Sequence, residues 1–129
     1  MLPDALVTLH IETPNRQIYS MIMDAWEKGN VDYDVLGSSY YPFWWNTPDM
    51  LRDVQTLAKE RGKLFAVMET AWVNSYEDGD GTSNSIGSDY GLYQYEIGPQ
   101  GQVDELTDMY KVLTEQDNGL GGFYWEPGW

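Results

Sequence analysis

The chain has 129 residues, the length of one ordinary domain. Its 7 Lys and Arg residues stand against 21 Asp and Glu residues. The resulting net charge of −14 excludes nucleic acids and anionic membranes as expected partners, because both bind basic surfaces. The absence of cysteine excludes disulfides and thiolate chemistry, and no segment approaches the roughly 20 apolar residues of a membrane span. Aromatic residues make up 15% of the chain, which indicates a large core or flat surfaces on which a ligand stacks.

The first two predicted elements are a strand and an amphipathic helix. Residues 5–11 form a mostly apolar segment that predicts a strand, and this segment ends before Pro14. Beyond Asn15 the apolar residues follow the i, i+3, i+4, i+7, i+8 spacing of one helix face, and Gly29 supplies the stop. The residues of this face are Ile18, Met21, Ile22, Ala25 and Trp26.

A second strand and a second helix come next. Residues 33–40 predict the strand, which leads into the aromatic segment 41–45. Thr47 and Pro48 supply a helix N-cap and a proline at the first helical position. The apolar face of this helix consists of Leu51, Val54, Leu57 and Ala58.

The third strand ends in a carboxylate. Residues 64–68 are all apolar and predict a buried parallel strand, and Glu69 follows directly. Burying a carboxylate is costly, and the C-terminal ends of strands carry the chemistry in α/β barrels, so Glu69 is a candidate catalytic residue. The alternative is a structural Glu that hydrogen-bonds to a neighbouring loop.

A long segment separates this strand from the last two elements. Residues 70–98 are rich in Gly, Ser, Asn and Asp, and loops of this length are uncommon unless they are functional or disordered. A short strand is expected over residues 121–125. Between the long segment and that strand, a third helix is marked by Val103, Leu106, Tyr110 and Leu113.

The order β-α-β-α-β-α-β predicts four parallel strands joined by three helices. Four such units are half of a (β/α)₈ barrel, which typically takes about 250 residues. A small open doubly wound sheet is the competing fold. That fold usually carries a glycine-rich turn after its first strand, and residues 12–15 are not such a turn.

In a parallel sheet the residues after each strand converge on one rim, which is where a barrel has its active site. Glu69 lies there among aromatic residues, a combination typical of carbohydrate sites because sugar rings stack on aromatic faces. Each flanking residue also has a structural interpretation: His10 as a hydrogen-bonded core residue, and Trp44 and Trp125 as a plug for the barrel mouth. The candidate rim residues are His10, Ser39, Tyr40, Trp44, Glu69, Trp125 and Glu126.

Three segments, residues 33–44, 67–70 and 123–129, resemble signatures of family 53 glycoside hydrolases, the endo-β-1,4-galactanases. The resemblance covers nearly the whole chain and implies strands five to eight of a (β/α)₈ TIM barrel, with a long insertion at about residues 70–98. It implies a secreted enzyme that hydrolyses β-1,4-galactan in plant cell-wall pectin with retention of configuration. In this family the nucleophile corresponds to Glu69, and Tyr40 is expected to hydrogen-bond to it.

The resemblance also predicts that one catalytic group lies outside the chain. Retaining hydrolysis needs two carboxyl groups about 5–5.5 Å apart. The related enzymes carry the acid/base Glu in an Asn-Glu pair after strand four, and the sequence contains no Asn-Glu pair. We therefore expect the chain alone to be inactive. Glu126 and Glu12 are candidate substitutes, although the resemblance supports neither.

The long segment contains oxygen-bearing side chains at alternate positions, the pattern of a loop that wraps Ca²⁺. Ser83 occupies the position of the glycine required in an EF-hand, so that motif is not indicated. The segment resembles the calcium loop of bacterial family members, in which residue 82 contributes its backbone carbonyl. A solvated acidic loop is the alternative. The predicted ligands are Asp78, Asp80, Thr82 and Asn84.

Two further functions stay open at this point. A non-catalytic half-barrel could bind saccharide, or could self-associate through its open sheet edges. Another retaining hydrolase of the same clan would keep Glu69 and act on a different sugar, but the segment 38–44 favours the galactanases.

Overall fold

The computed structural model describes residues 4–82, 86 and 94–125. Among these residues, no helix is long and apolar enough to cross a membrane. The elements in chain order are β1 (Thr8–Ile11), α1 (Arg16–Lys28), β2 (Val35–Tyr40), the 3₁₀ turn η1 (Pro42–Trp44), α2 (Pro48–Glu60), β3 (Leu64–Thr70), α3 (Pro99–Thr114) and β4 (Gly119–Tyr124).

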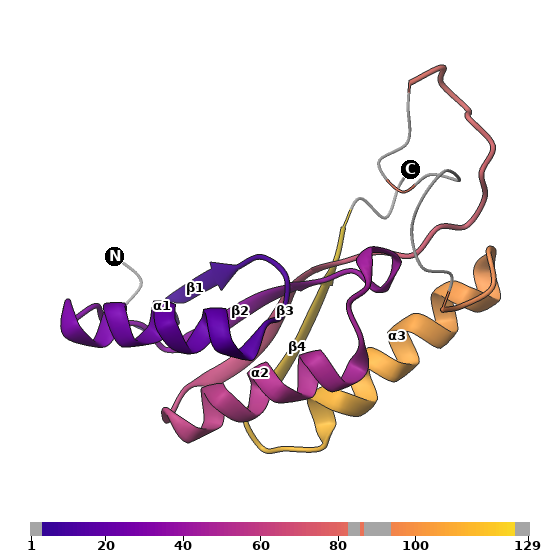
Figure 1. The fold of residues 1–129 in the computed structure, drawn as a ribbon. Coiled ribbons are helices and arrows are strands. Elements are labelled where there is room, and N and C mark those ends of the chain that lie inside the picture. The colour runs from indigo at the N-terminus through magenta and orange to yellow at the C-terminus, as the bar shows by residue number, and fades with distance from the viewer. Residues whose placement is uncertain (1–3, 83–85, 87–93, 126–129) are drawn as a thin grey trace.

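The four strands form one parallel sheet in the order β1-β2-β3-β4, so each strand pairs with its neighbour in the sequence. The helices lie along one side of this sheet, with α2 in contact with both α1 and α3 (Figure 1). The predicted α/β architecture of four parallel strands and three helices is confirmed. The described residues between β3 and α3 contain no helix or strand.

The helix starts follow the predicted capping signals. Asn15 accepts a hydrogen bond from the amide of Ile18 at 3.0 Å through its side chain, and α1 begins at the next residue. Thr47 caps α2 in the same way, with its hydroxyl 3.2 Å from the amide nitrogen of Met50, and proline occupies the first helical position. These bonds satisfy amide groups that a helix leaves unpaired at its start.

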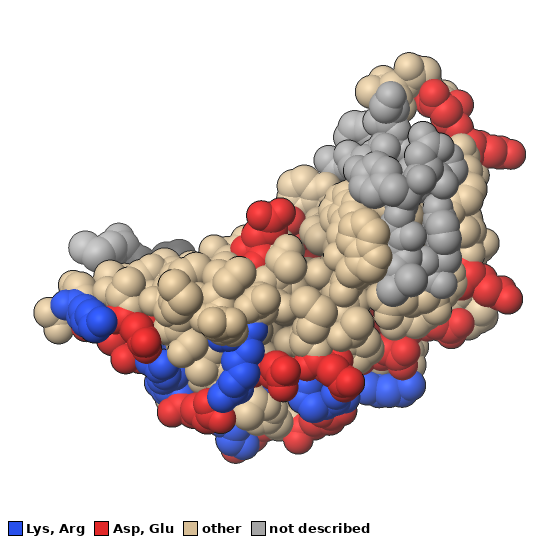
Figure 2. All heavy atoms as spheres, in the orientation of Figure 1, with Lys and Arg blue, Asp and Glu red and all other residues tan. Residues whose placement is uncertain are grey.

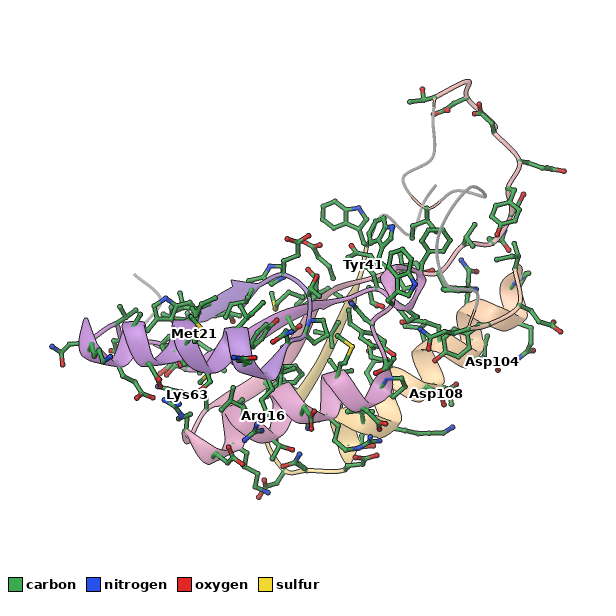
Figure 3. The ribbon with its side chains drawn as sticks, viewed as in Figure 1. Arg16, Met21, Tyr41, Lys63, Asp104 and Asp108 are labelled. Atoms are coloured by element: carbon green, nitrogen blue, oxygen red, sulfur yellow. The ribbon has the colours of Figure 1, made fainter. Side chains whose placement is uncertain are left out.

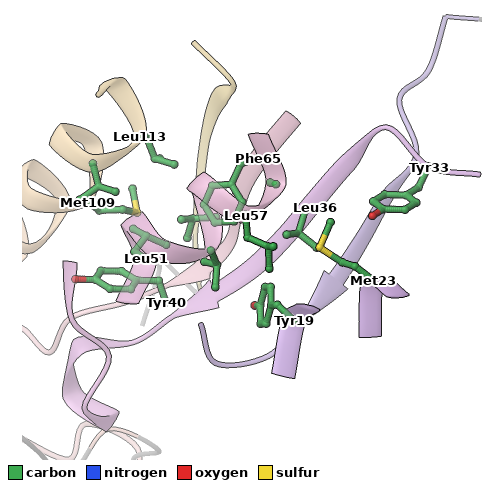
Figure 4. Close-up of a cluster of buried hydrophobic side chains, with 14 residues drawn as sticks. Tyr19, Met23, Tyr33, Leu36, Tyr40, Leu51, Leu57, Phe65, Met109 and Leu113 are labelled. Carbon is green, nitrogen blue, oxygen red and sulfur yellow. The ribbon is translucent and has the colours of Figure 1, made fainter. Parts of the chain in front are cut away.

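The core lies between the sheet and the helices (Figure 4). Phe65 and Val67 of β3 point into it, together with Leu51 of α2. Helix α3 forms as predicted, but Val103 and Tyr110 are exposed. Its buried residues are Gly101, Glu105, Met109, Val112 and Leu113.

Basic side chains gather on the helix side (Figure 2), and several of them pair with acids. Arg61, at the end of α2, binds Asp24 of α1 at 2.7 Å and Glu27 at 2.8 Å. Arg16 and Glu60 link the same helices at 2.5 Å. Each of these pairs is partly exposed, so their main effect is to fix the helices in register rather than to add much stability.

Substitution of Leu51 by Ala should lower the free energy of unfolding by about 2–5 kcal/mol, because the side chain is fully buried and its removal leaves a cavity. The matched control is Leu120→Ala in β4, where the side chain is 54% exposed and the expected loss is below about 1 kcal/mol. Urea unfolding monitored by tryptophan fluorescence measures both. Equal losses would contradict this assignment of the core.

Candidate active site

An open hollow of about 960 Å³ lies at the C-terminal ends of the strands. Its described lining includes no Lys or Arg. In Figure 3, Tyr41 marks this end of the sheet, away from the labelled basic residues Arg16 and Lys63. The residues that carry the argument below are Ser39, Tyr41, Trp44, Glu69, Trp72 and Trp125, which all line the hollow.

Glu69 lies near the end of β3, and two hydroxyl groups hold one of its carboxylate oxygens. Ser39 donates to Oε2 at 3.1 Å, and Tyr41 donates to the same atom at 3.2 Å. No residue in the described part of the chain donates to Oε1. The carboxylate is therefore fixed through one oxygen while the second remains available to react.

His10 joins this arrangement through Ser39. Its Nε2 lies 2.8 Å from the Ser39 hydroxyl oxygen. A serine hydroxyl has one proton, and Ser39 directs that proton to Glu69, so Nε2 of His10 is the donor in this contact. The structure thus brings His10, Ser39 and Glu69 together from three adjacent strands.

An irregularity in the pairing of β2 with β3 determines which way Glu69 points. Ser38 pairs with Val67, but Ser39 pairs with Glu69, so one residue of β3 is left over. Side chains alternate between the two faces of a strand, and an extra residue reverses the alternation beyond it. Glu69 consequently lies on the same side of the sheet as Met68, and Thr70 points toward the helices.

The predicted contact of Tyr40 with Glu69 is wrong. The Tyr40 side chain is fully buried in the core between the sheet and the helices, so it cannot line the hollow. The hydroxyl beside Glu69 belongs to Tyr41, two residues after Ser39 and therefore on the same face of the chain. The two-residue alternation from Ser39 is the sequence signal that identifies Tyr41.

Aromatic rings form one wall of the hollow. Trp44 packs edge-on against Tyr41 with ring centroids 5.0 Å apart. Trp125, at the end of β4, is 50% exposed and lines the hollow as predicted. Trp72 is almost fully buried and donates its indole N–H to the carbonyl of Glu96 at 2.8 Å, which ties the long loop to the site. The sequence analysis did not select Trp72, although it follows Glu69 by three residues.

A second carboxyl group lies buried behind Glu69. Glu105 of α3 has no exposed surface, and its Oε1 accepts a hydrogen bond from the Thr70 hydroxyl at 2.6 Å. Burial raises the pKa of Glu105 to about 7, and the Thr70 hydrogen bond offsets only part of this effect. Glu105 was not among the predicted site residues, because those were chosen at strand ends. Its i, i+4, i+7 spacing with Met109 and Val112 nevertheless places Glu105 on the buried face of α3.

In the long loop, the side chains of two predicted metal ligands bind backbone amides of the loop itself. Asp78 accepts hydrogen bonds from the amides of Asp80 at 3.2 Å and Gly81 at 2.7 Å, and Asp80 accepts one from the amide of Thr82 at 2.8 Å. The described residues contain no group of three or more His, Cys, Asp or Glu placed to hold a metal ion. The calcium site therefore stays a prediction. The predicted residues Asn84 and Glu126 lie outside the described residues.

A carboxylate at the end of a parallel strand, held by hydroxyl groups and flanked by aromatic rings, is typical of barrel glycoside hydrolases. The family model described as glycosyl hydrolase family 53 matches residues 1–129, and the chain belongs to this family. The sequence-based assignment to it is confirmed.

Curated relatives agree with this family. The chain is 40% identical over 127 residues to an endo-β-1,4-galactanase of Bacillus subtilis (strain 168), which covers 96% of the chain and 30% of that protein. It is 31% identical over 125 residues to an arabinogalactan endo-β-1,4-galactanase of Cellvibrio japonicus (strain Ueda107), covering 95% of the chain and 33% of the relative. The chain thus spans about a third of the length of these relatives.

Solved structures match the fold over almost the whole chain. The family 53 catalytic domain of Ignisphaera aggregans superposes with a TM-score of 0.89 at 32% identity, covering 99% of this chain and 37% of that one. A fungal β-1,4-galactanase structure superposes with a TM-score of 0.78 at 26% identity, covering 99% of this chain and 40% of the other. The predicted half of a (β/α)₈ barrel is confirmed.

Substitution of Glu105 by Gln should make the protein less sensitive to pH. The folded-state pKa of about 7 lies above the ordinary 4.5, so the folded state holds a proton that the unfolded state has lost, and stability falls as pH rises between these values. Relative to wild type, the free energy of unfolding of Glu105→Gln should therefore rise from pH 4.5 to pH 8 by an amount on the order of 3 kcal/mol.

Urea unfolding at a series of pH values measures this difference. Asp104→Asn, an exposed position next to Glu105 on α3, is the matched control and should follow the wild-type pH dependence. A difference between Glu105→Gln and wild type that is constant with pH would contradict the prediction.

Proposed function

We propose that the chain supplies the nucleophile half of a retaining endo-β-1,4-galactanase site, with Glu69 as the nucleophile. The observation that carries this proposal is the pair of hydroxyl contacts from Ser39 and Tyr41 to one oxygen of Glu69 at the rim of the sheet. Family membership and the names of the relatives support the substrate class, a β-1,4-galactan or arabinogalactan.

In this proposal, Oε1 of Glu69 attacks the anomeric carbon of the bound galactosyl unit. The glycosidic bond breaks as the new C–O bond forms, and the leaving oxygen takes a proton from the acid/base group. The hydrogen bonds from Ser39 and Tyr41 keep Oε2 in place, so the nucleophile does not need to reorient during the reaction. Water then releases the sugar with its original configuration.

We further propose that the acid/base carboxyl group is supplied by residues outside the 129-residue chain. A retaining mechanism needs it about 5–5.5 Å from Glu69. The sequence contains no Asn-Glu pair of the kind expected to carry this group. Glu12 lines the same hollow from the segment that follows β1.

The aromatic wall suits a neutral polysaccharide. Trp44 and Trp125 offer flat surfaces on which the C–H faces of galactose can stack, while His10 and Ser39 can contact its hydroxyl groups. The lack of Lys and Arg in the described lining disfavours an anionic ligand. Because such a polysaccharide is an extracellular polymer, we propose that the enzyme acts outside the cell.

We propose that the long loop binds Ca²⁺ through Asp78, Asp80 and the backbone carbonyl of Thr82, with Asn84 as a further ligand. The fit rests on the donor set: each of the two carboxylates uses one oxygen for amide contacts and retains its Oδ2 for a cation. The ion would hold the loop that borders the hollow, because Glu77, Asp80 and Thr82 all line it.

A second candidate function is self-association or saccharide binding without turnover. The observation in its favour is an apolar hollow of about 480 Å³ near the opposite end of the sheet, lined in part by Leu6, Met68, Leu120 and Phe123. Three of these side chains are more than half exposed: Leu6, Leu120 and Phe123. A second copy of the chain, or the other half of a barrel, would cover them.

The proposed function is tested with a complete barrel in which the chain follows strands one to four of the Bacillus subtilis relative. This barrel should hydrolyse β-1,4-galactan with retention, as followed by NMR of the first product. Glu69→Gln should reduce the rate at least about a thousandfold. The matched control is Glu12→Gln, which alters a carboxylate of the same hollow and should change the rate little.

The isolated chain should bind galacto-oligosaccharides without hydrolysing them, and its mass in solution reports self-association. Hydrolysis by the isolated chain would mean that the second carboxyl group lies within it. A complete barrel that keeps its rate after Glu69→Gln would exclude Glu69 as the nucleophile.

Substitution of Tyr41 by Phe in the complete barrel should lower kcat about ten- to a hundredfold, since it removes one hydrogen bond to a charged group worth about 1.5–3 kcal/mol. The control is Tyr40→Phe, which removes the neighbouring hydroxyl from the buried side of β2 and leaves both contacts to Glu69 in place. Steady-state kinetics on galactan give both values. A larger effect at Tyr40 would contradict the assignment of Tyr41.

Removal of calcium should lower the melting temperature of the isolated chain, because a ligand that binds only the folded state stabilises it. Adding Ca²⁺ after treatment with a chelator should restore the melting temperature, and Asp78→Asn with Asp80→Asn should abolish the response. Asp32→Asn, an exposed acid outside the loop, is the control. A melting temperature that does not depend on Ca²⁺ would contradict the site.

A further inference from the structure

A buried polar cluster lies on the side of β3 opposite the hollow. The Thr70 hydroxyl donates to Oε1 of Glu105 at 2.6 Å, and both side chains are fully buried. The fully buried Tyr40 of β2 completes this layer. On the far side of the cluster, Tyr95 donates to Asp108 of α3 at 3.2 Å.

Two polar atoms of the cluster have no hydrogen-bond partner in the described part of the chain. They are Oε2 of Glu105 and the hydroxyl oxygen of Tyr40. The Tyr95 hydroxyl lies near that of Tyr40 but does not meet the geometry of a hydrogen bond. A buried polar atom without a partner is destabilising, so two of them in one cluster call for a functional explanation.

Thr70 connects this cluster to the site in two ways. It directly follows Glu69 in the chain, and its carbonyl accepts a hydrogen bond from the amide of Trp125 at 2.7 Å. A displacement of Thr70 would therefore move both Glu69 and Trp125. Among the described residues, the Thr70 side chain hydrogen-bonds only to Glu105.

We propose that Glu105 is a positioning residue that holds Glu69 and Trp125 in place through Thr70, and that the gain or loss of its proton alters this hold. The inference rests on the proposed role of Glu69 as the nucleophile. The neutral acid accepts the Thr70 hydrogen bond without placing a charge in the core. An ionised Glu105 would need further donors, and the structure gives it no second one among the described residues.

The surroundings of Glu105 make its ionisation costly near neutral pH. Burial is the largest cause of its raised pKa of about 7, and the negative charge of Asp108 on the same helix raises it further. The groups that face it from other segments are the hydroxyls of Thr70 on β3, Tyr40 on β2 and Tyr95 in the loop before α3. Lys111 of the same helix is paired with Asp108 at 2.8 Å, and its side chain is 67% exposed.

NMR of the isotopically labelled chain tests the proposal without any assay of hydrolysis. The carboxyl resonance of Glu105 should shift between pH 6 and 8, and the amide resonances of Glu69 and Trp125 should shift together with it. In Glu105→Gln, which keeps an oxygen acceptor for Thr70, both amides should stay at their low-pH positions throughout. In Asp104→Asn they should behave as in wild type.

Thr70→Val separates a positioning role from a purely electrostatic one. Glu105 should still titrate in this variant, but the amides of Glu69 and Trp125 should no longer follow it. Amides that do not respond to pH in wild type, or that still follow Glu105 in Thr70→Val, would overturn the proposal. Because no readout depends on turnover, loss of hydrolysis in the complete barrel would bear on the proposed function and leave this result intact.

Discussion

The extra residue at the end of β3 determines where the charged groups of this sheet point. With regular pairing, Ser39 would lie opposite Met68, and the carboxylate of Glu69 would enter the core beneath the helices. The register shift turns Glu69 toward the hollow, where two hydroxyl groups meet it, and turns Thr70 toward α3, where it meets Glu105. Both the candidate nucleophile and the buried acid behind it depend on this one irregularity.

The same irregularity explains why the two faces of the strand end can serve different purposes. The face toward the hollow presents the partly buried carboxylate of Glu69, and only Oε2 of this group accepts hydrogen bonds from the described residues. The face toward the helices presents the Thr70 hydroxyl, which donates to Glu105 of α3, and burial raises the pKa of this acid to about 7. Glu69 and Thr70 are joined by one peptide group, so a displacement of the Thr70 backbone also displaces Glu69. This is a short route compared with the networks usually invoked for coupling between sites.

The elements and their order could be predicted from the sequence because capping residues and apolar spacing agree at each helix start, as at Asn15 and Thr47. Glu69 could be predicted because it ends an apolar strand. The contact between Tyr40 and Glu69 was a wrong prediction, since no Gly or Pro marks the shift at Met68 and only the alternation from Ser39 favours Tyr41. Glu105 was missed because the sequence alone does not distinguish a buried helix Glu from a solvent-exposed one. The difference comes from tertiary packing.

The charged side chains described above are distributed unevenly between the helix layer and the hollow. Three basic side chains that pair with acids, those of Arg16, Lys59 and Arg61, belong to the helix layer. The only charged residues in the described lining of the hollow are acids. A polyanion approaching the sheet would be repelled from the hollow at low ionic strength, and an uncharged chain would meet no such barrier. We therefore expect the hollow to disfavour anionic polymers relative to uncharged ones.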